Sequence, residues 1–264
     1  MGALNSGQSS WSKVGMINAF GTSYGDFTAQ ASNVFSLAGQ WDNMIAYETP
    51  DFAGFKLFAQ YGMGSNDNEN ESSSDRFYSL GVTYNNGPFA SYLAVDSINY
   101  KTAKFGTGEY PNNGDDIDDS LTVTFGGNYD FEVVKLFAGA QYFDEIKLSN
   151  MKGAVNFEDA DSGIATKMKG WSLGVSGSIP VAGGNVLVGA AYLDAEAADS
   201  VKDATKNDEL TRWIVSAGYD YQLSKRTNVY GILTYNQDSI DSDNKASERD
   251  PSVFGVMVGL RHKF

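Results

Sequence analysis

Cysteine is absent from this chain of 264 residues, and histidine occurs once, as His262. The lack of cysteine excludes a disulfide framework, a thiolate metal site and a cysteine nucleophile. The single histidine excludes any site that needs two. Apolar residues never run for the roughly eighteen positions that a transmembrane helix requires, and residues 1–15 lack the basic and apolar regions of a signal peptide. No motif implies an enzyme reaction, a cofactor or a bound metal.

Proline is also scarce, with 5 residues, whereas glycine, tyrosine and phenylalanine number 29, 15 and 16. This composition favours many β-strands that are joined by tight turns. The formal net charge is −14. Such a charge repels polyanions, so nucleic acid is not expected as a partner.

Apolar side chains recur at every second position along most of the chain, which is the period of a β-strand with one apolar face. In segment 55–61 the odd positions are all apolar, whereas Lys56 and Gln60 lie on the other face. The clear segments are 55–61, 78–84, 121–129, 134–142, 171–179, 213–221 and 254–264, and the weaker ones are 42–49, 88–97, 184–194 and 227–236. The sequence therefore predicts eleven antiparallel strands in chain order, with 254–264 at one end of the sheet.

The predicted strands are about ten residues long, which is what a tilted strand needs to cross a bilayer. Their apolar faces end in aromatic residues such as Tyr61, Tyr78, Trp171 and Trp213. Outer-membrane barrels carry such rings in two interfacial girdles. The opposite faces carry small and polar residues, which suit a wet interior. The predicted fold class is all-β, a transmembrane antiparallel β-barrel.

The connections between these strands alternate between short and long. The short ones are 50–53, 85–87, 130–132, 180–183 and 222–226, and the long ones are about 63–75, 98–119, 145–167, 196–210 and 237–251. Short periplasmic turns and long outer loops are typical of outer-membrane barrels. Most of the 33 acidic residues lie in or just before the long connections. They could bind divalent cations, but no EF-hand spacing is present, so a solvated loop surface is the favoured interpretation.

The chain ends in an alternating strand, Gly259 to Phe264, with phenylalanine as the last residue. This strand, together with segments 42–55, 130–139 and 223–230, resembles the Gram-negative general porins, the trimeric family of beta-proteobacteria. The resemblance implies a 16-stranded barrel in the bacterial outer membrane, a homotrimer, and contacts with lipid and lipopolysaccharide. It also implies that Phe264 is the signal read by the membrane-assembly machinery.

In that family one loop folds into the pore. The resemblance places a constriction-loop region at residues 1–41, with Tyr24, Asp26 and Phe27, and eleven strands of one domain at 42–264. It further implies that a signal peptide and about five N-terminal strands are not included in the chain. The eleven strands alone would leave 42–49 and 254–264 as unpaired edges, so an open, curved sheet is expected. One departure is Ala46, because the family carries a basic residue at that lumenal position.

Pore-lining residues are expected on the polar faces of the strands, whereas Leu57, Leu136 and Trp213 should point outward. The expected pore-lining residues are Lys56, Gln60, Lys135, Gln141, Arg212, Asp220, Arg261 and Lys263. A basic wall opposite the constriction loop would create a transverse field for solutes. The alternative is that these residues are ordinary wall positions in ion pairs. His262 falls on the outward face, where no catalytic role is expected.

The predicted function is therefore passive diffusion of ions and small hydrophilic solutes through a water-filled outer-membrane channel. A substrate-selective channel is the first alternative, since Phe58, Phe77 and Phe137 fall on lumenal positions and could form an aromatic slide. A soluble β-barrel that binds a ligand is the second alternative.

Overall fold

The computed structural model describes residues 13–21, 24, 34–35, 43–63, 76–99, 104–105, 108–109, 119–147, 167–199, 208–241 and 248–263. Eleven of its strands form one sheet: β1 (Met44–Glu48), β2 (Phe55–Gly62), β3 (Arg76–Asn86), β4 (Phe89–Asn99), β7 (Ser120–Asp130), β8 (Lys135–Lys147), β9 (Lys167–Val181), β10 (Gly184–Ala197), β11 (Glu209–Ser224), β12 (Thr227–Asp241) and β13 (Ser252–His262). A short hairpin of β5 (Lys104–Phe105) and β6 (Gly108–Glu109), which was not predicted, lies within a long connection. A single 3₁₀ turn, η1 (Val14–Met16), precedes the sheet.

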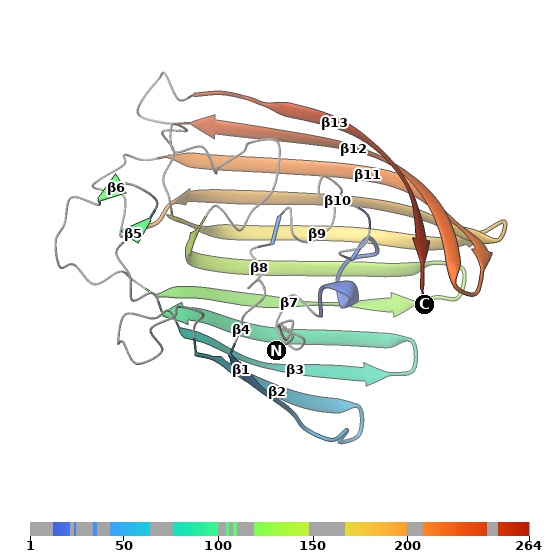
Figure 1. Cartoon of the computed structure of the whole chain (residues 1–264), viewed down its shortest axis with the longest axis horizontal. Coiled ribbons are helices and arrows are strands. Elements are labelled where there is room, and N and C mark those ends of the chain that lie inside the picture. Colours follow the sequence, from blue (N-terminus) through green and yellow to red (C-terminus); the bar gives the residue numbers. More distant parts are fainter. Residues whose placement is uncertain are drawn as a thin grey trace.

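The strands of the large sheet follow chain order, and each pairs antiparallel with the next. The predicted topology is confirmed. Figure 1 looks into the concave side of this curved sheet, with β13 at the top and β1 and β2 at the bottom. Within the described residues no pairing joins β1 to β13, so the sheet is open and these two strands are its edges.

Short turns lie at one end of the sheet, which we call the turn end, and long connections lie at the other, the loop end (Figure 1). The β9–β10 turn shows why so few residues suffice. Ala182 and Gly183 have φ angles of 48° and 81°. Two positive φ values give a turn whose twist matches that of the flanking strands. Adjacent strands therefore stay in register up to the turn.

Several strands are longer than the ten residues expected, and β11 reaches 16. The extra residues lie mainly at the loop end; β12, for example, continues to Asp241 instead of ending near residue 236. Its backbone pairs with β11 as far as Glu209. A ladder of hydrogen bonds continues wherever both partners stay extended, even after the alternation of apolar and polar residues that marks the strand in sequence has weakened.

The convex face of the sheet is apolar and exposed. Leu57, Leu136 and Trp213 are 55%, 48% and 41% exposed, and they point outward as predicted. Aromatic rings pair near both ends of this face: Tyr61 with Tyr78, Trp171 with Tyr192 and Trp213 with Tyr235 at the loop end, and Phe55 with Tyr84 and Tyr129 with Phe131 at the turn end. Two bands of rings around an apolar surface match the interfacial girdles of a membrane-spanning barrel.

The concave face holds the buried residues of the protein. Polar side chains such as Thr124, Gln141 and Ser216 are buried there beside apolar ones such as Ile214 and Ile232. A cluster of buried apolar residues packs between this face and the N-terminal segment. In the described residues, the polar side chains of the sheet therefore lie on the concave face, and its exposed apolar side chains lie on the convex face.

Candidate functional site

The polar side chains of the concave face bond to one another across neighbouring strands. Gln141 of β8 donates to Thr124 Oγ1 of β7 at 2.7 Å. The Ser216 hydroxyl of β11 donates to Thr234 Oγ1 of β12 at 2.8 Å. Because period two sends these residues to one side, the sheet presents a hydrogen-bonded hydrophilic surface to its interior.

A segment of the chain crosses this concave face at an angle to the strands. We call its described residues, 13–21 and Tyr24, the strap. It begins at the sheet edge, where Lys13 Nζ lies 3.5 Å from Glu48 of β1 and 5.6 Å from the centre of the Phe58 ring of β2. In Figure 1 its η1 turn lies in front of the middle strands.

Two hydrogen bonds between backbone groups of the strap and side chains of the sheet fix the middle of the strap. The side-chain amide of Asn128 in β7 donates to the Met16 carbonyl at 2.8 Å. The Ala19 N–H donates to Ser176 Oγ of β9, also at 2.8 Å. The strap contributes only backbone atoms to both bonds, which any residue could supply. The side chains of Asn128 and Ser176 therefore determine where the strap lies on the sheet.

Glycines on the concave face make room for the apolar side chains of the strap. A Cβ at Gly126 or Gly139 would stand 2.5 Å or 2.9 Å from Ile17 side-chain atoms, and one at Gly189 would stand 2.9 Å from the Phe20 ring. Gly126 and Gly139 face each other across β7 and β8. The absence of side chains at these positions lets Ile17 and Phe20 pack against the backbone of the sheet.

The strap ends in a cluster at the turn end of β11, β12 and β13. The Tyr24 hydroxyl donates to Asp220 of β11, and its ring packs edge-on against Tyr230 of β12, with centroids 5.1 Å apart. Arg261 of β13 lies 3.1 Å from Asp220 and 5.0 Å from the Tyr24 ring centre. Asn228 donates to Asp220 and accepts from Arg261. Tyr24 thus contacts the last three strands at once.

The electrostatic environment of this cluster keeps the Tyr24 phenol neutral. Burial is the main cause that raises its pKa, and the bond to the Asp220 carboxylate adds to it, so that the pKa of Tyr24 reaches about 12. The hydroxyl is therefore a hydrogen-bond donor at any physiological pH.

Basic side chains predominate on the concave face toward the turn end. Glu48 is shared by Lys13 and Lys56, at 3.5 Å and 3.2 Å. Lys135 of β8 makes no ion pair within the described residues and lies over the Phe137 ring, 5.5 Å from its centre. With Arg261, the described residues of this region supply four cations and two carboxylates, Glu48 and Asp220. The local balance is positive in a chain whose net charge is −14.

Arg212 points to the concave side as predicted, but it is completely buried. Its guanidinium forms two bonds to Asp238 of β12, at 2.6 Å and 2.8 Å, and both side chains have no exposed surface. Asp238 neutralises it, so we do not count Arg212 among the cations that solvent reaches. Lys167 and Glu145, 3.1 Å apart, form a second buried pair near the loop end.

The other residues predicted to line a pore have different surroundings. Gln60, Gln141 and Asp220 lie on the concave face and are buried, whereas Arg261 is about one-third exposed. Lys263 follows the last residue of β13 and is exposed at the turn end. Asp26, Phe27 and Phe264 lie outside the described residues. Whether this set lines a channel stays a prediction.

The structure adds residues that sequence reasoning did not single out, above all Lys13, Ile17, Asn128 and Asp238. Asn128 falls on a predicted inward position, so period two could have named it. Asp238 lies beyond the predicted end of its strand near residue 236, so the alternation did not cover it. Nothing in the sequence pairs Ile17 with Gly126, because that contact joins segments more than a hundred residues apart.

Within the described part of the chain, no helical segment has the length or hydrophobicity to span a membrane. Residues 3–241 match the model of the Gram-negative porin family. The chain belongs to this porin family. Its polar concave face, apolar convex face and alternating connections are the features of a porin sheet, and porins are proteins of the bacterial outer membrane.

Two curated porins are similar to this one. An outer membrane porin protein of Bordetella pertussis is 27% identical over 95% of this chain and 64% of its own length. The outer membrane porin protein 32 of Delftia acidovorans is 30% identical over 84% of this chain and 56% of its own. The chain therefore spans less than two thirds of these relatives.

A solved structure confirms the fold. The anion-selective porin from Comamonas acidovorans superposes with a TM-score of 0.60 at 20% identity, and the match covers 94% of this chain and 72% of that one. The predicted fold class is confirmed, although in this porin chain the eleven-stranded sheet is not closed.

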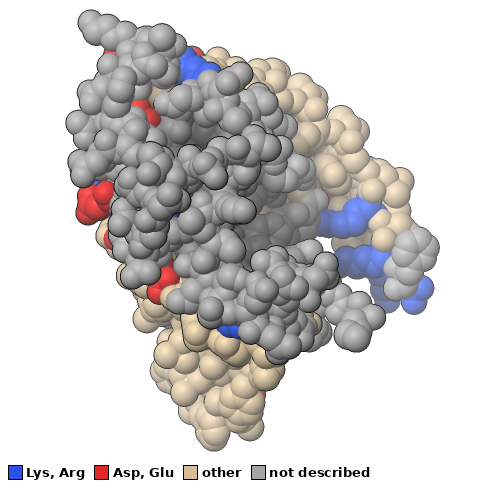
Figure 2. All heavy atoms as spheres, turned by 60° about the vertical axis from the view of Figure 1, so that its left-hand side comes forward, with Lys and Arg blue, Asp and Glu red and all other residues tan. Residues whose placement is uncertain are grey.

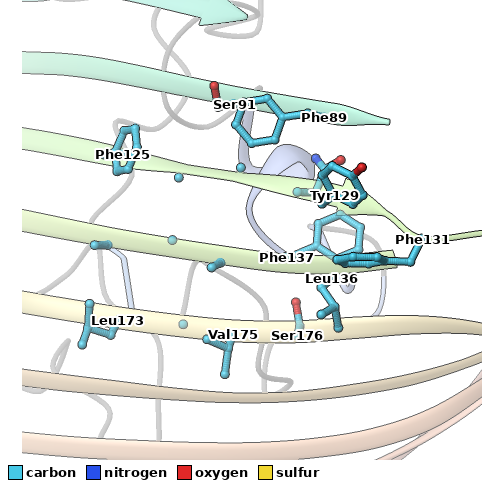
Figure 3. A pocket seen from close by; sticks show the side chains of 17 residues that line it. Phe89, Ser91, Phe125, Tyr129, Phe131, Leu136, Phe137, Leu173, Val175 and Ser176 are labelled. Carbon is cyan, nitrogen blue, oxygen red and sulfur yellow. The ribbon is translucent and has the colours of Figure 1, made fainter. Parts of the chain in front are cut away.

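The convex face of this porin sheet also carries an apolar hollow (Figure 3). Phe125, Leu136, Leu173 and Val175 stand around it on β7, β8 and β9, and small residues form its floor. Its lining side chains are mainly those that alternate outward, away from the strap. The hollow therefore belongs to the outer apolar surface and not to the hydrophilic interior.

Proposed function

We propose that the protein forms a water-filled passage through the outer membrane for passive diffusion of ions and small hydrophilic solutes. The observation that carries the proposal is the inverted arrangement of the sheet, with hydrogen-bonded polar residues on the concave face and exposed apolar residues on the convex one. Such a sheet is stable only where lipid covers its convex face. The solute would pass along the concave face, beside the strap.

In this proposal the whole chain is one porin domain. Residues 1–41 supply the constriction loop, and the strap is the part of it that narrows the passage. The porin assembles as a homotrimer, as its family resemblance implies, and its loop end meets lipopolysaccharide. Lys56, Lys135 and Arg261 line the passage near the strap.

The passage should prefer anions. Among the described residues toward the turn end of the concave face, the four cations outnumber the two carboxylates, and a low-dielectric wall strengthens their effect on passing ions. The name of the similar porin from Comamonas acidovorans, which describes it as anion-selective, supports the same polarity.

The alternatives receive no support from particular residues. Phe58 and Phe77 have no exposed surface and Phe137 is 9% exposed, so these rings offer little surface for an aromatic slide. A soluble ligand-binding barrel would bury apolar side chains inside, whereas here the convex face exposes Leu80, Val256 and Val258.

A planar-bilayer recording tests the proposal. The protein that carries this chain, purified from outer membranes, should give conductance steps, and a salt gradient should give a reversal potential of the sign for anions. Changing both Lys56→Gln and Lys135→Gln should lower the anion-to-cation permeability ratio, roughly severalfold, because half of the local cations are removed. Arg249→Gln, an exposed change at the loop end, is the control.

The outcomes separate the parts of the proposal. Absence of conductance would refute the channel itself. Conductance with a cation preference, or an unchanged ratio in the double variant, would refute the assignment of anion preference to these lysines.

A further inference from the structure

Three basic residues lie close together in the backbone at the turn end of β11, β12 and β13. Lys225 and Arg226 form the β11–β12 turn, and Lys263 follows β13. The Lys263 N–H donates to the Arg226 carbonyl at 2.8 Å, which fixes the end of β13 beside the turn. All three residues are exposed. We call these three residues the basic corner.

The basic corner has no acidic partner within the described residues. Arg261, the nearest other cation along the chain, is paired with Asp220 on the concave side, but no ion pair reaches Lys225, Arg226 or Lys263. Figure 2 shows Lys and Arg atoms at the right of the view, whereas most of the visible Asp and Glu atoms lie at its left. Three exposed cations without a described acidic partner attract external anions.

The other turns at this end are different. The β7–β8 connection carries Glu132 next to Asp130, the β1–β2 connection carries Asp51, and the β9–β10 turn has no charge. Among the short connections at this end, all of which lie within the described residues, the β11–β12 turn is therefore the basic one. Lys56 and Lys135 lie near the same end, but on the first residues of their strands and on the concave face.

The depth of the basic corner follows from the apolar residues beside it. Leu223 and Leu260 are the last apolar side chains on the convex face of β11 and β13, and they are 55% and 65% exposed. Lys225 lies two residues beyond Leu223, which is roughly 7 Å along a strand. The headgroup layer on each side of the hydrocarbon core is about 5–8 Å thick. In a bilayer whose hydrocarbon ends near these leucines, the cations would stand near the level of lipid phosphates.

We propose that the basic corner binds the phosphate of an anionic phospholipid in the leaflet at the turn end. The acyl chains would lie along Leu223 and Leu260, and the phosphate would be held by Lys225, Arg226 and Lys263. In this proposal Lys263 reaches the outer rim and does not line the passage. A soluble anion would gain only the charge contacts, whereas a lipid also covers the exposed leucines. This inference rests on the outer-membrane location and is independent of channel activity.

Native mass spectrometry of the purified porin in non-ionic detergent tests this site. Phosphatidylglycerol and phosphatidylethanolamine with identical acyl chains are titrated separately. The porin should bind phosphatidylglycerol more tightly, and high salt should reduce the difference. The triple variant Lys225→Gln, Arg226→Gln, Lys263→Gln should lose about tenfold or more of the affinity for phosphatidylglycerol. Arg249→Gln, at the opposite end of the β12–β13 hairpin, should keep it.

Each other result overturns the proposal. Equal binding of the two lipids by the unaltered porin would do so without any variant, and so would a triple variant that folds and retains the preference. Competition with inorganic phosphate identifies the source of the anion. If free phosphate displaced phosphatidylglycerol at equal concentration, the corner would be a phosphate site and not a lipid site.

Discussion

Tyr24 is the residue through which the strap reaches the last three strands. Its hydroxyl donates to Asp220, its ring contacts Tyr230, and the Arg261 guanidinium lies over the same ring. Deprotonation would place a phenolate beside a carboxylate in a buried site. The folded state therefore holds the phenolic proton more tightly than the unfolded state does, and the contact should weaken only in strong base.

Tyr24 should titrate later than an ordinary tyrosine. Its pKa is raised from 10.0 to about 12. The stabilisation that this proton provides is complete below pH 10 and is lost as the pH rises toward 12. When the folded porin is titrated with base, its phenolate absorbance should contain a late component near pH 12. This component should be missing in Tyr24→Phe. The variant should lose about 1 kcal/mol of unfolding free energy at neutral pH.

Tyr47→Phe is the matched control, because Tyr47 is an exposed tyrosine of β1. This variant should keep the late component of the titration. If Tyr24→Phe removed only an ordinary component, the phenol would not be held as the structure indicates.

At the scale of elements, the β11–β12 hairpin shows how one irregularity determines which charges meet. Ser224 pairs with Thr227 at the turn, but a β-bulge between Gln222 and Ser224 shifts the register by one residue. Arg212 then lies opposite Asp238. Without the bulge it would lie opposite Ser239, and Asp238 would face the other side of the sheet. The buried ion pair therefore depends on the bulge.

Removal of Asp238 should leave an uncompensated charge in a dry site. Asp238→Ala is expected to lower the unfolding free energy by about 3–5 kcal/mol, which denaturant unfolding in detergent would measure. Asp241→Ala, an exposed change on the same strand, should have little effect. Replacement of both Arg212 and Asp238 by leucine should recover much of the loss. A single Asp238→Ala variant as stable as the control would contradict this role.

The same hairpin indicates how far the sequence could predict the structure. Alternation placed Lys56, Lys135 and Arg212 on the inner side, and turn residues such as Gly183 separated the strands correctly. The bulge left no signal in the alternation, so the partner of Arg212 was not predicted. The anchors of the strap were missed for another reason: Asn128 and Ser176 contact residues that lie more than a hundred positions away in the chain. Local periodicity carries no information about such contacts.

At the scale of the whole molecule, the open edges matter most. β13 has eleven residues, and about half of its N–H and C=O groups point away from β12, which leaves about five of each without a partner in the sheet. Every such group costs several kcal/mol in hydrocarbon. Direct closure of β1 onto β13 would be irregular, because an odd number of antiparallel strands makes the first and last parallel, against the even number normal in bacterial barrels. We propose that further strands of a complete barrel cover both edges.

Refolding of residues 1–264 alone provides the test. With β1 and β13 uncovered, the sheet should not seal a pore, so the refolded chain should give no stable, uniform conductance steps in a planar bilayer. The protein isolated from outer membranes should give such steps under the same conditions. Backbone amide exchange adds a second measurement, since β13 should exchange faster than β9 or β10, which pair on both sides. Uniform steps from 1–264, or equal protection of β13 and β9, would mean that the two edges find each other and that the sheet closes without further strands.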